Sequence, residues 1–233
     1  MPNDVKVDVV VPAAGVGSRM RADKPKQYLL LDDSISILEA TIDSLLCCKH
    51  ISRIIVAISP HDHYFKNLPC AKDPRIIAVL GGAERADSVY LALKAVKTNY
   101  VMVHDAARPF VKAEDLEKLL SLCDSGVCGG ILASPVADTI KQSSSDTIEK
   151  TIDRRLLYRA FTPQLFETSL LLQALDYCRQ QQMAVTDEAS AIEALGLKPK
   201  LVNSSTENFK ITTPADLVLA RALYKYHKEN QCV

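Results

Sequence analysis

Short apolar runs rich in β-branched residues alternate along the chain with segments whose apolar positions repeat every three to four residues. The runs predict buried strands, and the repeats predict helices with one apolar face. The predicted strands cover Val5 to Val11, Arg53 to Ile58, Arg75 to Leu80 and Tyr100 to Val103. The predicted helices cover Ile37 to Leu46, Glu84 to Val96, Asp115 to Cys123 and Pro214 to Tyr226. This alternation indicates an α/β protein, with a mostly parallel sheet covered by helices on both faces.

The segment from Asp138 to Arg155 breaks this alternation. Its pattern is strand-like on both sides of the polar run Gln142 to Asp146, which predicts a hairpin arm on a single domain that spans residues 1–233. Two strands alone are marginally stable in water. We therefore expect the arm to pack against a second copy of the chain. The alternative is a flexible surface arm that packs against no partner.

The loop after the first predicted strand, AAGVGSRMRADKPKQYL (13–29), combines two glycines with two spaced cations. Backbone N–H groups of a glycine turn can face an anion, and Arg19 and Lys26 add positive charge, so the loop predicts a phosphate site. A dinucleotide-binding turn requires a third glycine where Met20 stands, and Pro25 disfavours a helix there. The Walker pattern does not fit either. The alternative is a tight turn whose charges are merely solvated.

The composition narrows the possible partners and the compartment. Lys plus Arg and Asp plus Glu number 28 each in 233 residues, which argues against a broad surface for nucleic acid or anionic membrane. No apolar run approaches the ~18 residues of a membrane-spanning helix. The seven cysteines are scattered and lack a C-x-x-C spacing. This usage is typical of reduced thiols, so we expect a cytoplasmic protein.

A second polar cluster, HDAARPF (104–110), follows the predicted strand that ends at Val103. Asp105 at the end of a strand is suited to a hydrated magnesium ion, which prefers one or two carboxylates plus phosphate oxygens. The planar guanidinium of Arg108 can donate two hydrogen bonds to a phosphate. Alternatively, Asp105 caps the next helix or pairs with Arg108. His104 is expected to be a hydrogen-bonded core residue.

The segment GGAERADS (81–88) offers backbone donors and acceptors next to the Ser88 hydroxyl. Such groups can read the hydrogen-bonding edge of a flat base, although an ordinary strand-to-helix turn explains the spacing equally well. Four further residues lie in polar segments between the predicted elements. Their spacing alone makes them weak candidates for a binding or catalytic site: Thr139, Arg154, Thr186 and Lys210.

Several blocks, in order along the chain, together resemble the 2-C-methyl-D-erythritol 4-phosphate cytidylyltransferases of the non-mevalonate isoprenoid pathway. The blocks are PAAGVGSRM, PKQY, GGAERADS, HDAARPF, Asp138-Thr139, Asp153-Arg154, TPQ (162–164), TDEA (186–189) and FKITTP. The resemblance implies a Rossmann-like nucleotidyltransferase fold with a protruding arm, and a homodimer whose arms embrace. It also implies that a cytidylyl group passes from CTP to 2-C-methyl-D-erythritol 4-phosphate, with release of pyrophosphate.

The resemblance also implies roles for matching residues. The CTP triphosphate would be held by Ala13, Ala14, Gly15, Gly17, Arg19 and Lys26, and cytosine would be read by Gly82, Ala83 and Ser88. Asp105 would position Mg²⁺, and Lys210 would join Arg19 and Lys26 as candidate catalytic residues. Methylerythritol phosphate would be bound by Thr186, Arg108, Thr139 and Arg154, the last three from the partner chain.

Two positions depart from the family pattern: Ala83 stands where some members carry Asp, and Phe209 where Ile is commoner. The reaction needs no protein nucleophile, because a phosphate monoester is already largely dianionic at neutral pH. A ribitol-5-phosphate cytidylyltransferase is the nearest alternative, and a non-catalytic dinucleotide-binding module is an alternative of another class.

Overall fold

Seven strands form one sheet in the computed structural model, which describes residues 5–15, 20 and 23–230. The strands are β1 (Val7–Pro12), β2 (Ile51–Ile58), β3 (Ile76–Leu80), β4 (Tyr100–Val103), β5 (Gly129–Pro135), β8 (Tyr158–Glu167) and β9 (Lys200–Asn203). Their order is β3-β2-β1-β4-β8-β5-β9. Within this sheet only β8 is antiparallel, to both β4 and β5. The predicted α/β class and the mostly parallel sheet are confirmed.

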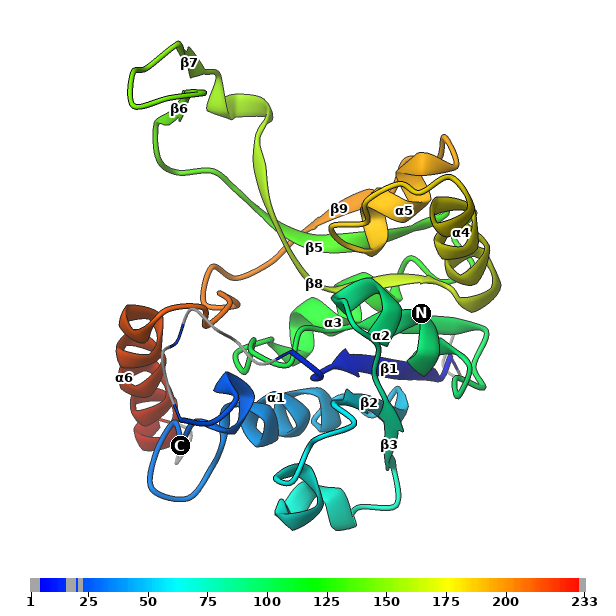
Figure 1. Cartoon of the computed structure of the whole chain (residues 1–233), viewed down its shortest axis with the longest axis vertical. Helices are drawn as coiled ribbons and strands as arrows, with labels where there is room; N and C mark the ends of the chain where they lie inside the picture. The colour runs from blue at the N-terminus through cyan, green and yellow to red at the C-terminus, as the bar shows by residue number, and fades with distance from the viewer. Residues whose placement is uncertain (1–4, 16–19, 21–22, 231–233) are drawn as a thin grey trace.

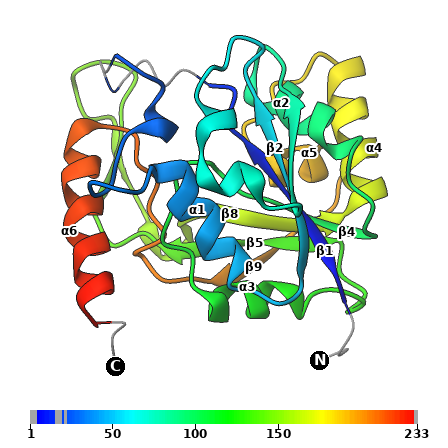
Figure 2. The same cartoon turned by 90° about the horizontal axis from the view of Figure 1, so that it is seen from below.

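Helices cover both faces of the sheet (Figure 1). They are α1 (Ile37–Leu46), α2 (Arg85–Leu93), α3 (Ala113–Leu120), α4 (Thr168–Gln180), α5 (Glu188–Ala194) and α6 (Pro214–Asn230). One face packs against α1 and α3, and the other against α2, α4 and α5. Helix α6 lies beside α1 at the side of the molecule (Figure 2). No helix in the described ranges has both the length and the apolar content needed to cross a bilayer.

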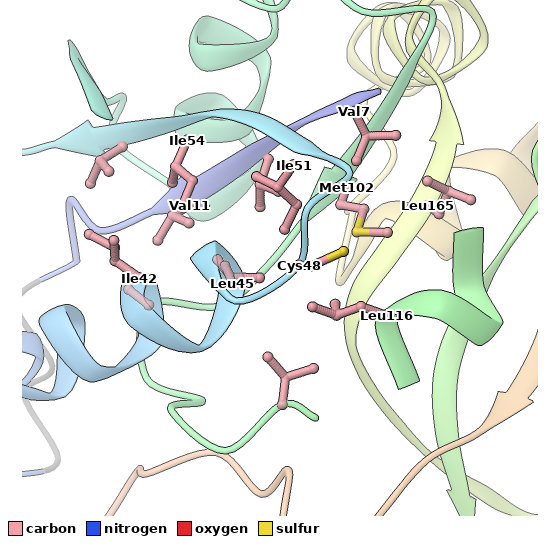
Figure 3. Packing of buried hydrophobic residues seen from close by; sticks show 14 of the residues in the cluster. Val7, Val11, Ile42, Leu45, Cys48, Ile51, Ile54, Met102, Leu116 and Leu165 are labelled. Atoms are coloured by element: carbon pink, nitrogen blue, oxygen red, sulfur yellow. The ribbon is translucent and has the colours of Figure 1, made fainter. Parts of the chain in front are cut away.

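The central strand β1 supplies side chains to both layers of the core. Val7, Val9 and Val11 pack with α1 and α3, as Figure 3 shows for Val7 and Val11, whereas Val10 packs with α2. This alternation follows from the period of two in a strand. A polar residue, Asp8, is also fully buried, because Arg53 and the Lys97 N–H neutralise and satisfy its carboxylate.

All four predicted strands and all four predicted helices are present, and most of their ends differ from the prediction by a few residues. Helix α1 has the predicted bounds because its start is encoded locally: Ser36 and Glu39 form a reciprocal capping box. The helix predicted over 84–96 ends at Leu93, and the one predicted over 115–123 runs from Ala113 to Leu120. At α6, Thr213 caps the helix, since its Oγ1 accepts from the Asp216 N–H at 3.2 Å.

The segment that breaks the alternation forms a hairpin of β6 (Ile140–Gln142) and β7 (Lys150–Ile152), paired antiparallel. A 3₁₀ turn, η5 (Arg154–Leu156), leads back to β8. The arm projects away from the sheet (Figure 1), and Leu156 at its base is 85% exposed.

Strands β3 and β9 form the two edges of the sheet. Among the described residues before β3 lie three further short 3₁₀ helices: η2 (Lys26–Tyr28), η3 (Phe65–Asn67) and η4 (Pro69–Lys72). Strand β9 is four residues long and follows Lys198 and Pro199.

Candidate active site

Three polar loops follow the carboxyl ends of the parallel strands β3, β1 and β4, at the same end of the sheet. Backbone hydrogen bonds extend the ladder into each loop: Ala13 N donates to Ala57 O at 2.8 Å, Gly81 N to Ile58 O at 2.8 Å, and His104 N to Val10 O at 2.9 Å. The loops are therefore fixed side by side. Ligands bind at this end in open α/β sheets.

A pocket of about 230 Å³ lies among these loops. Its lining includes Ala13, Ala14, Gly15, Lys26, Gln27, Gly82, Ala83, Arg85, Ser88, Asp105 and Lys210. The Lys26 Nζ donates to Ile211 O at 3.0 Å, across 185 positions of sequence. Residues from both ends of the chain thus meet in one cavity, which is lined by several cationic groups.

Hydrogen bonds from the buried Gln27 side chain fix the loop that follows β1. The buried amide of this residue donates to Ala13 O at 2.6 Å and to Gly15 O at 3.1 Å. A Cβ on Gly15 would meet no atom of the described residues within 4 Å. Close packing against the described residues therefore does not require glycine at this position.

The second loop needs glycine for close packing. A Cβ on Gly81 would lie 2.6 Å from the Ala14 Cβ and 2.8 Å from the Ser88 Oγ. The Ser88 Oγ accepts from Gly82 N at 3.1 Å and lies 3.1 Å from Glu84 O, to which it donates. Ser88 thus shapes the turn with its own hydroxyl.

The third loop carries Asp105, a carboxylate that is 6% exposed. Three cations contact it: the Arg85 Nε lies 3.1 Å from Oδ1, while the Arg108 Nε and the Lys210 Nζ lie 3.2 and 3.0 Å from Oδ2. Burial alone would raise the pKa of Asp105, but the neighbouring Arg85, Lys210 and Arg108 hold that pKa well below its usual range. Asp105 is therefore an anion over the working pH range.

A second pocket, of about 220 Å³, adjoins the first. Arg85, Asp105 and Lys210 line both cavities, and Arg108 and Thr186 line the second alone. The Arg108 guanidinium donates to Asn208 O at 2.8 Å and lies 5.1 Å from the centre of the Phe161 ring. The two pockets thus share a wall of one carboxylate and two cations.

Buried polar groups support this wall. The His104 Nε2 lies 3.0 Å from Arg108 O, and its Nδ1 lies 3.0 Å from the Thr162 Oγ1, which also accepts from Asp105 N. Burial lowers the pKa of His104 from 6.5 to about 4. His104 is therefore neutral near pH 7 and serves as a scaffold, as expected from the sequence.

The chain matches known proteins over almost its whole length. The sequence model of the family described as 2-C-methyl-D-erythritol 4-phosphate cytidylyltransferase matches residues 7–225. The chain belongs to this family. A protein of that name from Aliivibrio fischeri strain MJ11 is 49% identical over 97% of this chain and 98% of its own length. The same name is carried by a protein from Tolumonas auensis, 50% identical over 91% of this chain and 93% of its own length.

Solved structures of the cytidylyltransferase family share the fold. The Francisella tularensis protein superposes with a TM-score of 0.80 at 36% identity, covering 93% of this chain and 99% of its own. The Thermus thermophilus protein gives a TM-score of 0.80 at 32% identity, covering 95% and 100%. The expected nucleotidyltransferase fold and enzyme class are therefore confirmed.

The structure brings most of the candidate residues together. Nine of them line the first pocket: Ala13, Ala14, Gly15, Lys26, Gly82, Ala83, Ser88, Asp105 and Lys210. Arg108 and Thr186 line the second, so Arg108 lies beside the Asp105 of its own chain. Thr139 and Arg154 lie on the arm and line neither cavity. Gly17 and Arg19 lie outside the described residues. The roles implied for all these residues remain predictions.

Sequence reasoning missed three residues of this site: Gln27, Arg85 and Glu188. Arg85 lies in the motif GGAERADS, at the start of a predicted helix, where a cation is disfavoured by the helix dipole. That mismatch was a usable signal, because such a residue needs a carboxylate partner. Gln27 gave no comparable signal, since its two acceptors are carbonyls shaped by the fold.

Proposed function

We propose that the protein transfers the cytidylyl group of CTP to 2-C-methyl-D-erythritol 4-phosphate, releasing pyrophosphate. The observation that carries the proposal is the pair of adjoining pockets: one is lined by Lys26, Lys210 and the glycine turn, and the other by Arg108 and Thr186. We assign the triphosphate to the first pocket and the phosphate monoester to the second, because cationic side chains line both. Family membership supports the choice of substrates.

The substrate phosphate attacks the α-phosphorus of CTP in line with the departing pyrophosphate. Its dianionic form is nucleophilic without a protein base. The protein's task is then to hold two polyanions together and to stabilise the charge that moves onto pyrophosphate. We assign that task to Lys26, Lys210 and Arg19, and we assign cytosine recognition to the backbone of Gly82 and Ala83 with Ser88.

This site can hold Mg²⁺ only if one carboxylate is combined with phosphate oxygens and water. The described residues contain no group of three or more His, Cys, Asp or Glu side chains able to hold a metal ion. Asp105 is a single carboxylate already shared by three cations. Mg²⁺ accepts one carboxylate when phosphate oxygens and water complete its shell. Asp105 would then hold it beside the nucleotide, where it would neutralise phosphate charge.

We further propose that the protein is a homodimer in the cytoplasm. The arm exposes Leu156 and Ile148, and packing against a second copy would cover them and carry Thr139 and Arg154 to the partner's second pocket. The six described cysteines are all free thiols, which supports a reducing compartment.

Release of pyrophosphate from CTP and Mg²⁺ tests the reaction. Methylerythritol phosphate should support turnover, and ribitol 5-phosphate and the other nucleoside triphosphates should not. Faster turnover with ribitol 5-phosphate would favour the nearest alternative, and tight NADH binding without any response to CTP would favour the dinucleotide-binding module.

A further inference from the structure

Arg85, the first residue of α2, joins two carboxylates from distant segments. Its Nη1 and Nη2 donate to the Glu188 Oε1 and Oε2 at 2.7 and 3.0 Å, and its Nε donates to the Asp105 Oδ1 at 3.1 Å. Glu188 is 1% exposed. One planar guanidinium therefore fixes the spacing of Asp105 and Glu188, which an ammonium group cannot do with the same geometry.

Stability alone does not account for this arrangement. Burying a carboxylate and a guanidinium carries a large desolvation cost, and such pairs are often no more stabilising than apolar residues. The Arg85 cation also stands at the positive end of the α2 dipole. Arg85 therefore stands where the helix dipole disfavours a cation, and we attribute its presence to the fixed spacing that it gives Asp105 and Glu188.

The Arg85–Glu188 pair sets the position of the two pockets relative to each other. Arg85 lines both cavities and begins the helix that carries Ser88. Glu188 begins α5, directly after the Thr186 segment of the second pocket.

The start of α5 is also held from the sheet side. The Gln164 Nε2 donates to the Asp187 Oδ2 at 2.8 Å, and the Gln164 Oε1 accepts from Ala189 N at 2.8 Å. Gln164 therefore anchors α5 to β8, and the Arg85–Glu188 pair anchors α5 to the nucleotide side. The pair is thus a direct side-chain link between the two halves of the site.

We propose that Arg85 and Glu188 are positioning residues that set the relation of the two pockets, so that the two substrate phosphates meet in line. The inference rests on the proposed function. The Glu188 carboxylate accepts hydrogen bonds from both terminal nitrogens of Arg85. Asp105 accepts one hydrogen bond, from the Arg85 Nε. Without the Glu188 charge, Arg85 is drawn toward Asp105, and the α5 segment loses its tie to the nucleotide side.

Glu188→Gln and Arg85→Lys test the proposal through steady-state kinetics with both substrates varied and through calorimetric binding of CTP. For Glu188→Gln we expect the KM for methylerythritol phosphate to rise about tenfold, equivalent to about 1.4 kcal/mol, with the Kd for CTP within about threefold. For Arg85→Lys we expect kcat to fall about 10–100-fold. The double variant should be no worse than Arg85→Lys alone, because the two residues act as a unit.

Arg53→Lys is the matched control, because Arg53 pairs with buried Asp8 at the start of β1, at the opposite end of the strand from the site. It should lower the free energy of unfolding and leave the kinetics unchanged. If Glu188→Gln and Arg85→Lys also change only the unfolding free energy, or if their kinetic effects simply add, the positioning role is overturned.

Two outcomes separate this inference from the proposed function. A wild-type chain that releases no pyrophosphate from CTP and methylerythritol phosphate refutes the function and the inference together. An active wild type with unaltered pair variants refutes the inference alone. If Glu188→Gln does not fold, Arg85→Lys decides the question by the same measurements.

Discussion

Asp105 is a buried carboxylate between three cations, and its neighbours decide what chemistry is open to it. Its lowered pKa keeps it charged and excludes a role as a general acid near pH 7. Asp105 pairs with Arg108, and Arg85 and Lys210 share the same carboxylate. The role of Asp105 in positioning Mg²⁺ stays a prediction.

Lys26 is expected to act on the reaction more than on nucleotide affinity. Lys26→Ala should lower kcat by about 10²–10³, as for removal of one preorganised donor, with a smaller change in the Kd for CTP. Single-turnover kinetics and calorimetry measure the two effects. Lys24→Ala is the matched control, since Lys24 lies in the same loop and does not line the pocket. Near-normal turnover in Lys26→Ala would remove Lys26 from the mechanism.

Helix α1 illustrates how far local sequence determines an element. The Ser36 Oγ accepts from Glu39 N, and the Glu39 carboxylate accepts from Ser36 N at 3.0 Å. Ser36→Ala should lower the free energy of unfolding by about 1 kcal/mol, measured by urea denaturation. Ser44→Ala, later in the same helix, should cost less; an equal loss in both variants would contradict the capping argument.

The arm is expected to act on the second substrate from the partner chain. Arg154→Ala should raise the KM for methylerythritol phosphate, whereas Arg155→Ala should not, because Arg155 pairs with Asp153 on the arm itself. In hybrid dimers of Arg154→Ala and Lys26→Ala chains, one of the two sites has both native residues. At a methylerythritol phosphate concentration where each variant alone turns over slowly, mixing the two chains should therefore restore part of the wild-type activity. Purified hybrids that show no gain would rule out a shared site.

Elements with a local signal could be predicted, and those defined by tertiary partners could not. Strand β4 and helix α1 have the predicted bounds. The sequence does not predict strand β8, because Thr162 and Gln164 interrupt its apolar pattern, and the partners of these side chains include Asp105 N, His104 and the α5 segment, all distant in sequence. Helix α4 was also not assigned, although its apolar repeat would have allowed it.

The same division applies to the site. The cationic and glycine positions could be predicted from their place after strands and from the family resemblance. The bridge between Arg85 and Glu188 could not, because it spans 103 positions and depends on α2 and α5 packing on the same face of the sheet.

At the scale of the whole molecule, buried His104 couples folding to pH. The pKa of His104 is about 4 in the folded chain, below its ordinary 6.5. Between these values the unfolded chain binds a proton that the folded chain excludes, so stability falls as the pH drops from about 6.5 to about 4. The loss should approach about 3 kcal/mol. Below its ordinary value of 3.8, Asp105 adds a further loss in the same direction.

Urea denaturation as a function of pH measures this coupling. His104→Gln should flatten the decline between pH 6.5 and 4, and His61→Gln should not, because His61 is exposed. Equal slopes for His104→Gln and the wild type would assign the decline to other groups.

The β9 edge affects how copies of the chain meet one another in crowded solution. An open sheet edge is a template on which a strand from another molecule can add, and such addition leads to aggregates. Here the template is four residues long, begins at Lys200 and follows Lys198 and Pro199. Its brevity and its positive charge disfavour intermolecular strand addition, and Pro199 directly before it offers no N–H to a partner strand.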